Sequence, residues 1–385
     1  MKPCTQLPAQ AGAARLLLTG SFKNNPAIRP GLAKSCRAIH NSSPDPANVS
    51  PFYATGPPPE PPQPAAEHPY AKIERRRKQA ELLKKAKEIR NTTYTGKSGT
   101  APLKKRFWES VYVKEVDGSY QIHLDKRPLR HPVTKDTVLV PLSKPLLAHA
   151  LALEWDLITS AQQATRQHLI PLTSLICRAL DVAADDAANT GEFGPIRNSI
   201  TTMLLRYLDT DSLLCWAPPP PDPEDASLRD VQERTAGEII GHLSAHVWPG
   251  VEIEPVLDEG SILPKGQKAG VREVIQGWVM GLDAWELVAL ERACLAGKSL
   301  LCGVRLVVEW SEGAAGRAGR EIAAAQGLGD KRLFGVEEAA RAASLEVDWQ
   351  TKKWGEVEDT HDVEKEDIRR QLGSAVLLVS GTGSS

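Results

Sequence analysis

Residues 111–124 read VYVKEVDGSYQIHL, a short stretch in which apolar and polar side chains alternate on both sides of an Asp-Gly pair. Such alternation predicts two β-strands with one buried face each, and Asp-Gly at 117–118 is a strong signal for the turn of a hairpin. Residues 138–140 (VLV) predict another short strand, while Arg127-Pro128 is expected to bend the chain. We therefore expect residues 101–142 to form a small β-rich domain whose limited core is completed by the helices that follow.

Beyond residue 143 the apolar period lengthens to three and four residues, which is typical of helices that bury one face. The predicted helices span 146–159, 172–188, 196–207, 228–245, 271–279, 283–295, 300–309, 336–355 and 363–378. The predicted fold class is α+β: a small N-terminal β-rich domain is followed by a larger, mostly helical C-terminal domain over residues 143–378. Residues 379–385 are expected to form a disordered tail.

The charge of the chain is balanced overall but divided unevenly along it. Its 385 residues include 47 Lys+Arg and 48 Asp+Glu, a net charge of −1, and 41% of them are hydrophobic. Residues 1–100 hold 16 basic and 6 acidic side chains, whereas residues 101–385 hold 31 and 42. The composition is that of a globular protein, and no apolar run approaches the roughly 18 residues of a membrane-spanning helix, so membrane insertion is not expected.

The basic N-terminal part divides into three predicted segments. Residues 1–40 are basic, contain Ser and precede the first acidic residue, Asp45, which predicts a mitochondrial transit peptide. Residues 41–70 are Pro-rich and predict a disordered linker. Residues 71–100 include a charged, helix-forming stretch (72–90) with nine basic and three acidic side chains. This stretch is interpreted either as a solvated or self-docking helix or as an RNA-binding element, and the absence of interleaved aromatic residues favours the former.

Most motifs that would indicate enzyme chemistry are incomplete. The Gly-Lys-Ser triplets at 96–98 and 297–299 lack the earlier glycine of a phosphate-binding loop. His242 and His246 have the spacing of a zinc protease, but Leu243 occupies the place of the catalytic glutamate. The six cysteines form no CxxC pair, so a structural zinc site is not expected. The motifs therefore give little support to an enzyme.

The most unusual stretch is acidic and lies at residues 345–367, which read LEVDWQTKKWGEVEDTHDVEKED. It has three interpretations: a helix that ends at Gly355 with Asp359-Thr360 capping the next one, a protein-binding surface, or a metal cluster. The metal cluster would consist of Asp359, His361, Asp362 and Glu364. The predicted binding residues are Glu346, Asp348, Trp354, Glu358, Asp359, His361 and Asp362.

The chain resembles the mitochondrial assembly chaperones that hold the α subunit of the F-type ATP synthase catalytic head, in a fungal-like form. The resemblance runs from about residue 106 to residue 378. It rests on Arg106-Phe107-Trp108, Leu124-Asp125, Arg127-Pro128, Pro132, Glu154-Trp155-Asp156, Pro171-Leu172-Thr173, Asp181, Tyr207-Leu208-Asp209-Thr210-Asp211, Asp283, Trp285, Ala289-Leu290-Glu291, Lys298-Ser299-Leu300, Leu345-Glu346, Gln350, Trp354-Gly355, Val357-Glu358-Asp359 and His361-Asp362. His131 departs from the pattern, because a small hydroxyl residue is expected there, and the Pro-rich insert at 217–223 is expected to be a local surface loop.

The resemblance implies a chaperone of the mitochondrial matrix that binds the unassembled α subunit, prevents its aggregation and releases it to the β subunit. It implies a protein that is not an enzyme, has no ATPase activity, needs no metal, cofactor or small-molecule substrate and binds no nucleic acid. It also makes acidic residues of the C-terminal domain client contacts, Glu346 first among them. The alternatives are a matrix metal-dependent hydrolase using Asp359, His361 and Asp362, and an RNA-binding protein acting through residues 72–90.

Overall fold

The computed structural model describes residues 77–84, 106–189, 193–220, 227–257, 263–325, 334–356 and 360–381. Inter-residue contacts divide the chain into residues 1–59 and residues 60–385, and every element below belongs to the second unit. The predicted transit peptide and Pro-rich linker lie outside the described residues. Within the basic segment, residues 77–84 form a helix with every residue exposed.

An antiparallel sheet opens the folded part of the chain. Strands β1 (Val111–Val116) and β2 (Ser119–Leu124) pair as the predicted hairpin. Asp117 and Gly118 at its turn both have positive φ, 51° and 75°, as a two-residue turn between right-twisted strands requires.

The central strand of this sheet is β2. It also pairs with β3 (Arg127–Pro128) and with β4 (Leu139–Pro141). The expectation that Arg127-Pro128 only bends the chain is therefore wrong. The proline is accommodated because β3 is a two-residue edge strand.

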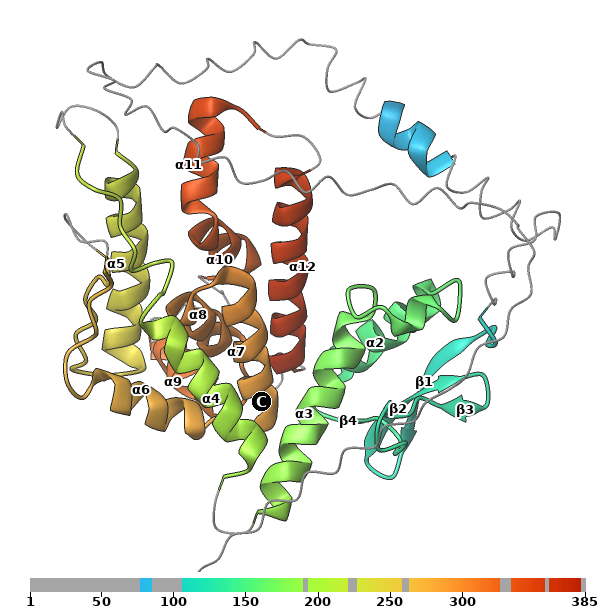
Figure 1. Ribbon diagram of the computed structural model, residues 1–385. Coiled ribbons are helices and arrows are strands. Elements are labelled where there is room, and N and C mark those ends of the chain that lie inside the picture. Colours follow the sequence, from blue (N-terminus) through green and yellow to red (C-terminus); the bar gives the residue numbers. More distant parts are fainter. Residues whose placement is uncertain are drawn as a thin grey trace, which may run out of the picture. The chain divides into compact units, whose positions relative to one another are not determined.

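Helices make up the rest of the described fold, as predicted (Figure 1). In chain order they are α2 (Pro145–Leu157), the 3-10 turn η1 (Gln163–Thr165), α3 (Pro171–Ala188), α4 (Pro195–Leu208), α5 (Leu228–His246), α6 (Val271–Met280), α7 (Ala284–Gly297), α8 (Leu300–Trp310), α9 (Ala314–Ala325), α10 (Val336–Ala343), α11 (Leu345–Trp354) and α12 (His361–Val379). The fold class is α+β, and none of the described helices combines the length and the apolarity that crossing a membrane demands.

Two helices differ from the sequence-based prediction. The predicted helix 336–355 is interrupted at Ser344, which ends α10 and precedes α11. The N–H of Ser344 is donated to the carbonyls of Ala340 and Arg341, so the chain tightens into a turn before the next helix begins. Helix α9 was not predicted, because its Ala- and Gly-rich sequence has only one large apolar residue, Ile322.

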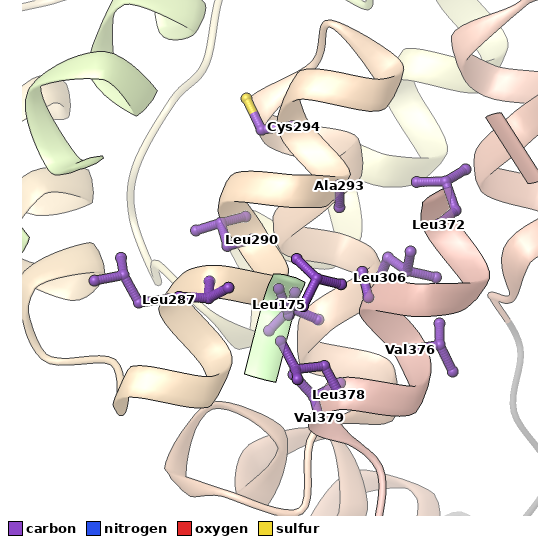
Figure 2. Close-up of a cluster of buried hydrophobic side chains, with 14 of the residues drawn as sticks. Leu175, Leu287, Leu290, Ala293, Cys294, Leu306, Leu372, Val376, Leu378 and Val379 are labelled. Atoms are coloured by element: carbon purple, nitrogen blue, oxygen red, sulfur yellow. The ribbon is translucent and has the colours of Figure 1, made fainter. Parts of the chain in front are cut away.

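Helix α7 is the centre of the helical core. It packs against α3, α8 and α12, and Leu287, Val288, Ala289 and Leu290 are fully buried in succession. Figure 2 shows Leu290 and Ala293 of α7 with Leu306 of α8 and the apolar end of α12. Because four consecutive residues of α7 are buried, the helix is packed around most of its circumference rather than along one face.

The loop between β3 and β4 is tied to α3 by the residue that departs from the family pattern. His131 is buried, and its Nδ1 accepts hydrogen bonds from the backbone N–H groups of Val133 and Thr134. A small hydroxyl could accept the same turn bonds. The imidazole in addition brings its Nε2 within 3.4 Å of the Asp181 carboxylate. The departure thus preserves the turn and adds a link between the sheet and the helices.

Candidate functional site

Many of the motif residues behind the resemblance hold the fold together. Glu154 of α2 is buried, and its carboxylate accepts the backbone N–H groups of Leu172 (2.8 Å) and Thr173 (3.0 Å) at the start of α3. The Thr173 hydroxyl bonds the same carboxylate, and Trp155 Nε1 donates to that hydroxyl. Burial raises the pKa of Glu154, and the hydrogen bonds from Thr173 and Leu172 oppose this effect. The Glu-Trp pair of one motif therefore caps the helix opened by the Pro-Leu-Thr of another.

A second motif pair forms a buried joint. Asp211 has no exposed surface, and its carboxylate accepts the N–H groups of Leu213 and Leu301, both at 3.0 Å. Burial raises the pKa of Asp211 to about 6, although hydrogen bonds from Ser299 and Leu301 favour its charged form. Ser299 also caps α8 by accepting the Cys302 N–H. The Gly-Lys-Ser triplet at 297–299 thus forms the turn between two helices.

The pair of histidines at zinc-protease spacing is also part of the packing. The rings of His242 and His246 on α5 meet edge to face with centroids 4.7 Å apart. Burial and, to a lesser extent, the charge of Arg305 on α8 lower the pKa of His242 to about 4, so this imidazole is neutral near pH 7. No cluster of three or more His, Cys, Asp or Glu side chains suited to a metal ion occurs within the described ranges.

The acidic stretch forms α11, a turn and the start of α12. Helix α11 ends at Gly355, as predicted, with a φ of 92° that favours glycine. Thr360 occupies the N-cap position of α12, but its side chain makes no capping hydrogen bond there, so this part of the capping prediction is wrong. Glu358 and Asp359 lie outside the described residues, which leaves the predicted metal cluster without a description of one of its ligands.

Lys365 of α12 joins the acidic residues of two segments. Its Nζ lies 3.4 Å from an Asp348 carboxylate oxygen and 3.6 Å from one of Glu356. A cleft of about 180 Å³ lies beside this pair and is also lined by Ser344 and Arg369. Sequence reasoning placed Asp348 on the binding surface but missed Lys365, because the contact depends on how α11 and α12 pack.

Glu346 differs from the motif residues that stabilise the fold. Its side chain is exposed, and its carboxylate accepts a hydrogen bond of 3.0 Å from Gln350 one turn later on the same helix. Within the described parts of the chain it joins no ion pair to another element. Its negative charge is therefore available at the surface.

Apolar side chains are exposed close to these acids in the sequence. Trp354, the last residue of α11, is 47% exposed, and Val363 in the first turn of α12 is 63% exposed. His361 and Asp362 begin α12 and are half-buried. The arrangement combines exposed negative charge with an exposed tryptophan, a pairing suited to binding a basic and partly apolar protein surface.

Comparison with known proteins gives one family. A family model described as ATP12 chaperone protein matches residues 105–244. The chain is 31% identical over 303 residues to "Protein ATP12, mitochondrial" of Saccharomyces cerevisiae, covering 75% of this chain and 88% of the relative. It is 28% identical over 286 residues to "Protein atp12, mitochondrial" of Schizosaccharomyces pombe, covering 72% and 82%. The crystal structure of Atp12 from Paracoccus denitrificans matches with 21% identity and a TM-score of 0.48, covering 71% of this chain and 97% of that one.

Proposed function

Because this chain belongs to the ATP12 chaperone family, we propose that its direct client is the α subunit of the mitochondrial F-type ATP synthase. The protein is a chaperone and assembly factor of ATP synthase, and its family is not enzymatic. The curated relatives are mitochondrial proteins. Residues 1–40 have the composition of a transit peptide. We propose that the protein acts in the matrix, where it would meet a newly imported subunit.

The proposed mechanism is reversible holding. An unassembled subunit exposes apolar surface that is buried only in the finished complex, and such surface promotes aggregation. A partner that binds this surface lowers the concentration of the aggregation-prone form by mass action. Arrival of the β subunit, which needs the same surface, would then displace the chaperone and drive assembly forward.

We propose that the client contacts the surface formed by α11 and the first turns of α12. The contacts would be Glu346, Asp348, Trp354, Glu358, Asp359, His361 and Asp362. One observation carries this assignment: Glu346 belongs to the resemblance motifs, yet it is exposed and bonds only within its own helix among the described residues. Glu154 and Asp211, by contrast, have buried structural partners.

Charge reversal at Glu346 tests the proposal with purified α subunit. We expect Glu346→Lys to weaken binding by about tenfold at low salt, and the loss to shrink at high salt, where charges are screened. Glu115→Lys is the matched control, because Glu115 is an exposed acid on β1 outside the proposed site. Failure of the wild type to bind the α subunit would overturn the client. Equal binding by Glu346→Lys and wild type would overturn the site.

A further inference from the structure

Helix α2 has a second apolar face beside the one that the described fold buries. Leu147, Leu151 and Trp155 are buried against the sheet and the neighbouring helices. The second face carries a row that we call the α2 stripe, made of the exposed Leu146, Leu153 and Leu157 and of Ala150, which is half-buried and packs in part against the core. Leu146, Leu153 and Leu157 are 57%, 59% and 71% exposed.

The stripe is continuous because of its spacing. Its members follow one another at intervals of four, three and four residues, so they lie along one side of the helix over roughly 16 Å. At 100° per residue, the centre of this side lies about 130° around the helix from that of Leu147, Leu151 and Trp155. Figure 1 shows α2 between the sheet and α3, the elements that its buried face contacts.

A surface of this kind is unusual on a helix that already has a buried side. A globular helix normally carries polar residues opposite its apolar face, and contiguous exposed apolar patches of a few hundred Å² tend to mark binding sites. The exposed parts of three leucines amount to a patch on the order of 300 Å². A stable homodimer needs about 800 Å² from each partner, so the stripe alone is too small for a permanent contact with a second copy.

The flanks of the stripe indicate the chemistry of its partner. His149 lies beside it, and Asp156 lies near its end, where the Asp156 carboxylate is 3.4 Å from the Arg106 guanidinium. The acid at this end is therefore already paired with a base. The stripe offers apolar contact without excess charge, in contrast to Glu346 on α11.

We propose that the α2 stripe holds an apolar segment of the unassembled α subunit, an inference that rests on the proposed function. A subunit interface that is covered before assembly is apolar, and a small reversible contact suits a partner that must later be released. The acidic surface of α11 and α12 would attract the client over distance, whereas the stripe would slow its departure. Charged surfaces act mainly on association, while desolvated apolar contacts act mainly on dissociation.

The test measures the association and dissociation rates of the full chain with purified α subunit at low and high salt. The double variant Leu153→Glu, Leu157→Glu is expected to dissociate at least about tenfold faster at both salt concentrations, with little change in association. The milder pair Leu153→Ala, Leu157→Ala should show the same direction, and thermal unfolding checks that both variants are folded. Val274→Glu on α6 is the control, because Val274 is 46% exposed on a different helix, and it should behave as wild type.

The outcomes separate the inference from the function on which it rests. Wild-type dissociation rates in both double variants, with the α subunit bound, would overturn the stripe but leave the proposed client intact. A concentration-dependent dimer that the stripe variants abolish, seen by sedimentation, would overturn it in favour of a second copy. Absence of α-subunit binding by the wild type would overturn the proposed function and this inference together.

Discussion

At the scale of single residues, the buried acids show how this fold uses polar side chains. Glu154 and Asp211 each accept backbone N–H groups at the start of a helix in a dry environment. An unsatisfied buried N–H costs about 1–3 kcal/mol, so each carboxylate stabilises the junction that it joins. The cost of burying the charge remains and appears in the raised pKa of both groups.

Asp211 should therefore make stability depend on pH in a defined direction. Its pKa is about 6 in the folded protein and about 3.9 in the unfolded chain, so the folded state binds more protons between these values. The free energy of unfolding should fall by about 2 kcal/mol through this group as the pH rises from 4 to 6. Urea unfolding of wild type and Asp211→Asn at a series of pH values measures this loss as a change in their difference.

A second group with a shifted pKa makes the comparison with Asp211→Asn necessary. His242, with a pKa of about 4, has the opposite effect, because stability is lost as the pH falls from 6.5 towards 4. The comparison with Asp211→Asn removes this background, since His242 is present in both proteins. Asp117→Asn, at the exposed hairpin turn, is the control for loss of one negative charge. Parallel stability curves for wild type and Asp211→Asn would contradict the prediction.

At the scale of elements, α7 should be the helix that tolerates truncation least. Leu290 is fully buried, and replacing it with alanine should cost about 2–5 kcal/mol because a cavity remains. Leu295 is on the same helix but 44% exposed, so Leu295→Ala should cost well under about 2 kcal/mol. Urea denaturation of both variants gives the comparison. Similar losses would mean that Leu290 and Leu295 do not differ in burial as the structure has it.

How far the sequence predicted each element depended on whether the signal was local. The periods of Leu172–Leu175–Ala179 and of α7, and the Asp-Gly turn of the hairpin, lie within short stretches, and the structure has these elements where they were expected. The break at Ser344 was missed because apolar spacing continues on both sides of it. The salt bridges of Lys365 could not be predicted, since they depend on the packing of α11 against α12.

The α2 stripe was overlooked for a different reason. Its leucines repeat at the same helical period as the buried row of Leu147, Leu151 and Trp155, so both rows support the same helix prediction. Only burial separates the inward row from the outward one. At the site, Glu346 and Trp354 could be identified as candidates from composition and resemblance. That both side chains are exposed could be seen only in the structure.

At the scale of the whole molecule, charge is separated along the chain in a way that bears on binding. The folded part beyond residue 100 has 31 basic and 42 acidic side chains, and residues 1–100 have 16 and 6. Long-range electrostatic attraction depends on the net charge that a partner meets. A basic client should therefore meet less attraction from the full chain than from the acidic part alone.

Removal of residues 1–100 tests both the predicted domain boundary and this electrostatic effect. The core is built from residues 106–381, so the shortened protein should keep its thermal midpoint. Its association with the α subunit should become faster at low ionic strength and more sensitive to salt, because the excess of basic residues is gone. Dissociation should not change, since the α2 stripe is intact.

Stopped-flow mixing over about 50–500 mM salt measures the association and dissociation rates. Combining the deletion with Glu346→Lys should reverse part of the gain in association rate. If neither the deletion nor Glu346→Lys alters the association rate, the first contact with the client is made by an apolar surface and not by the acidic one.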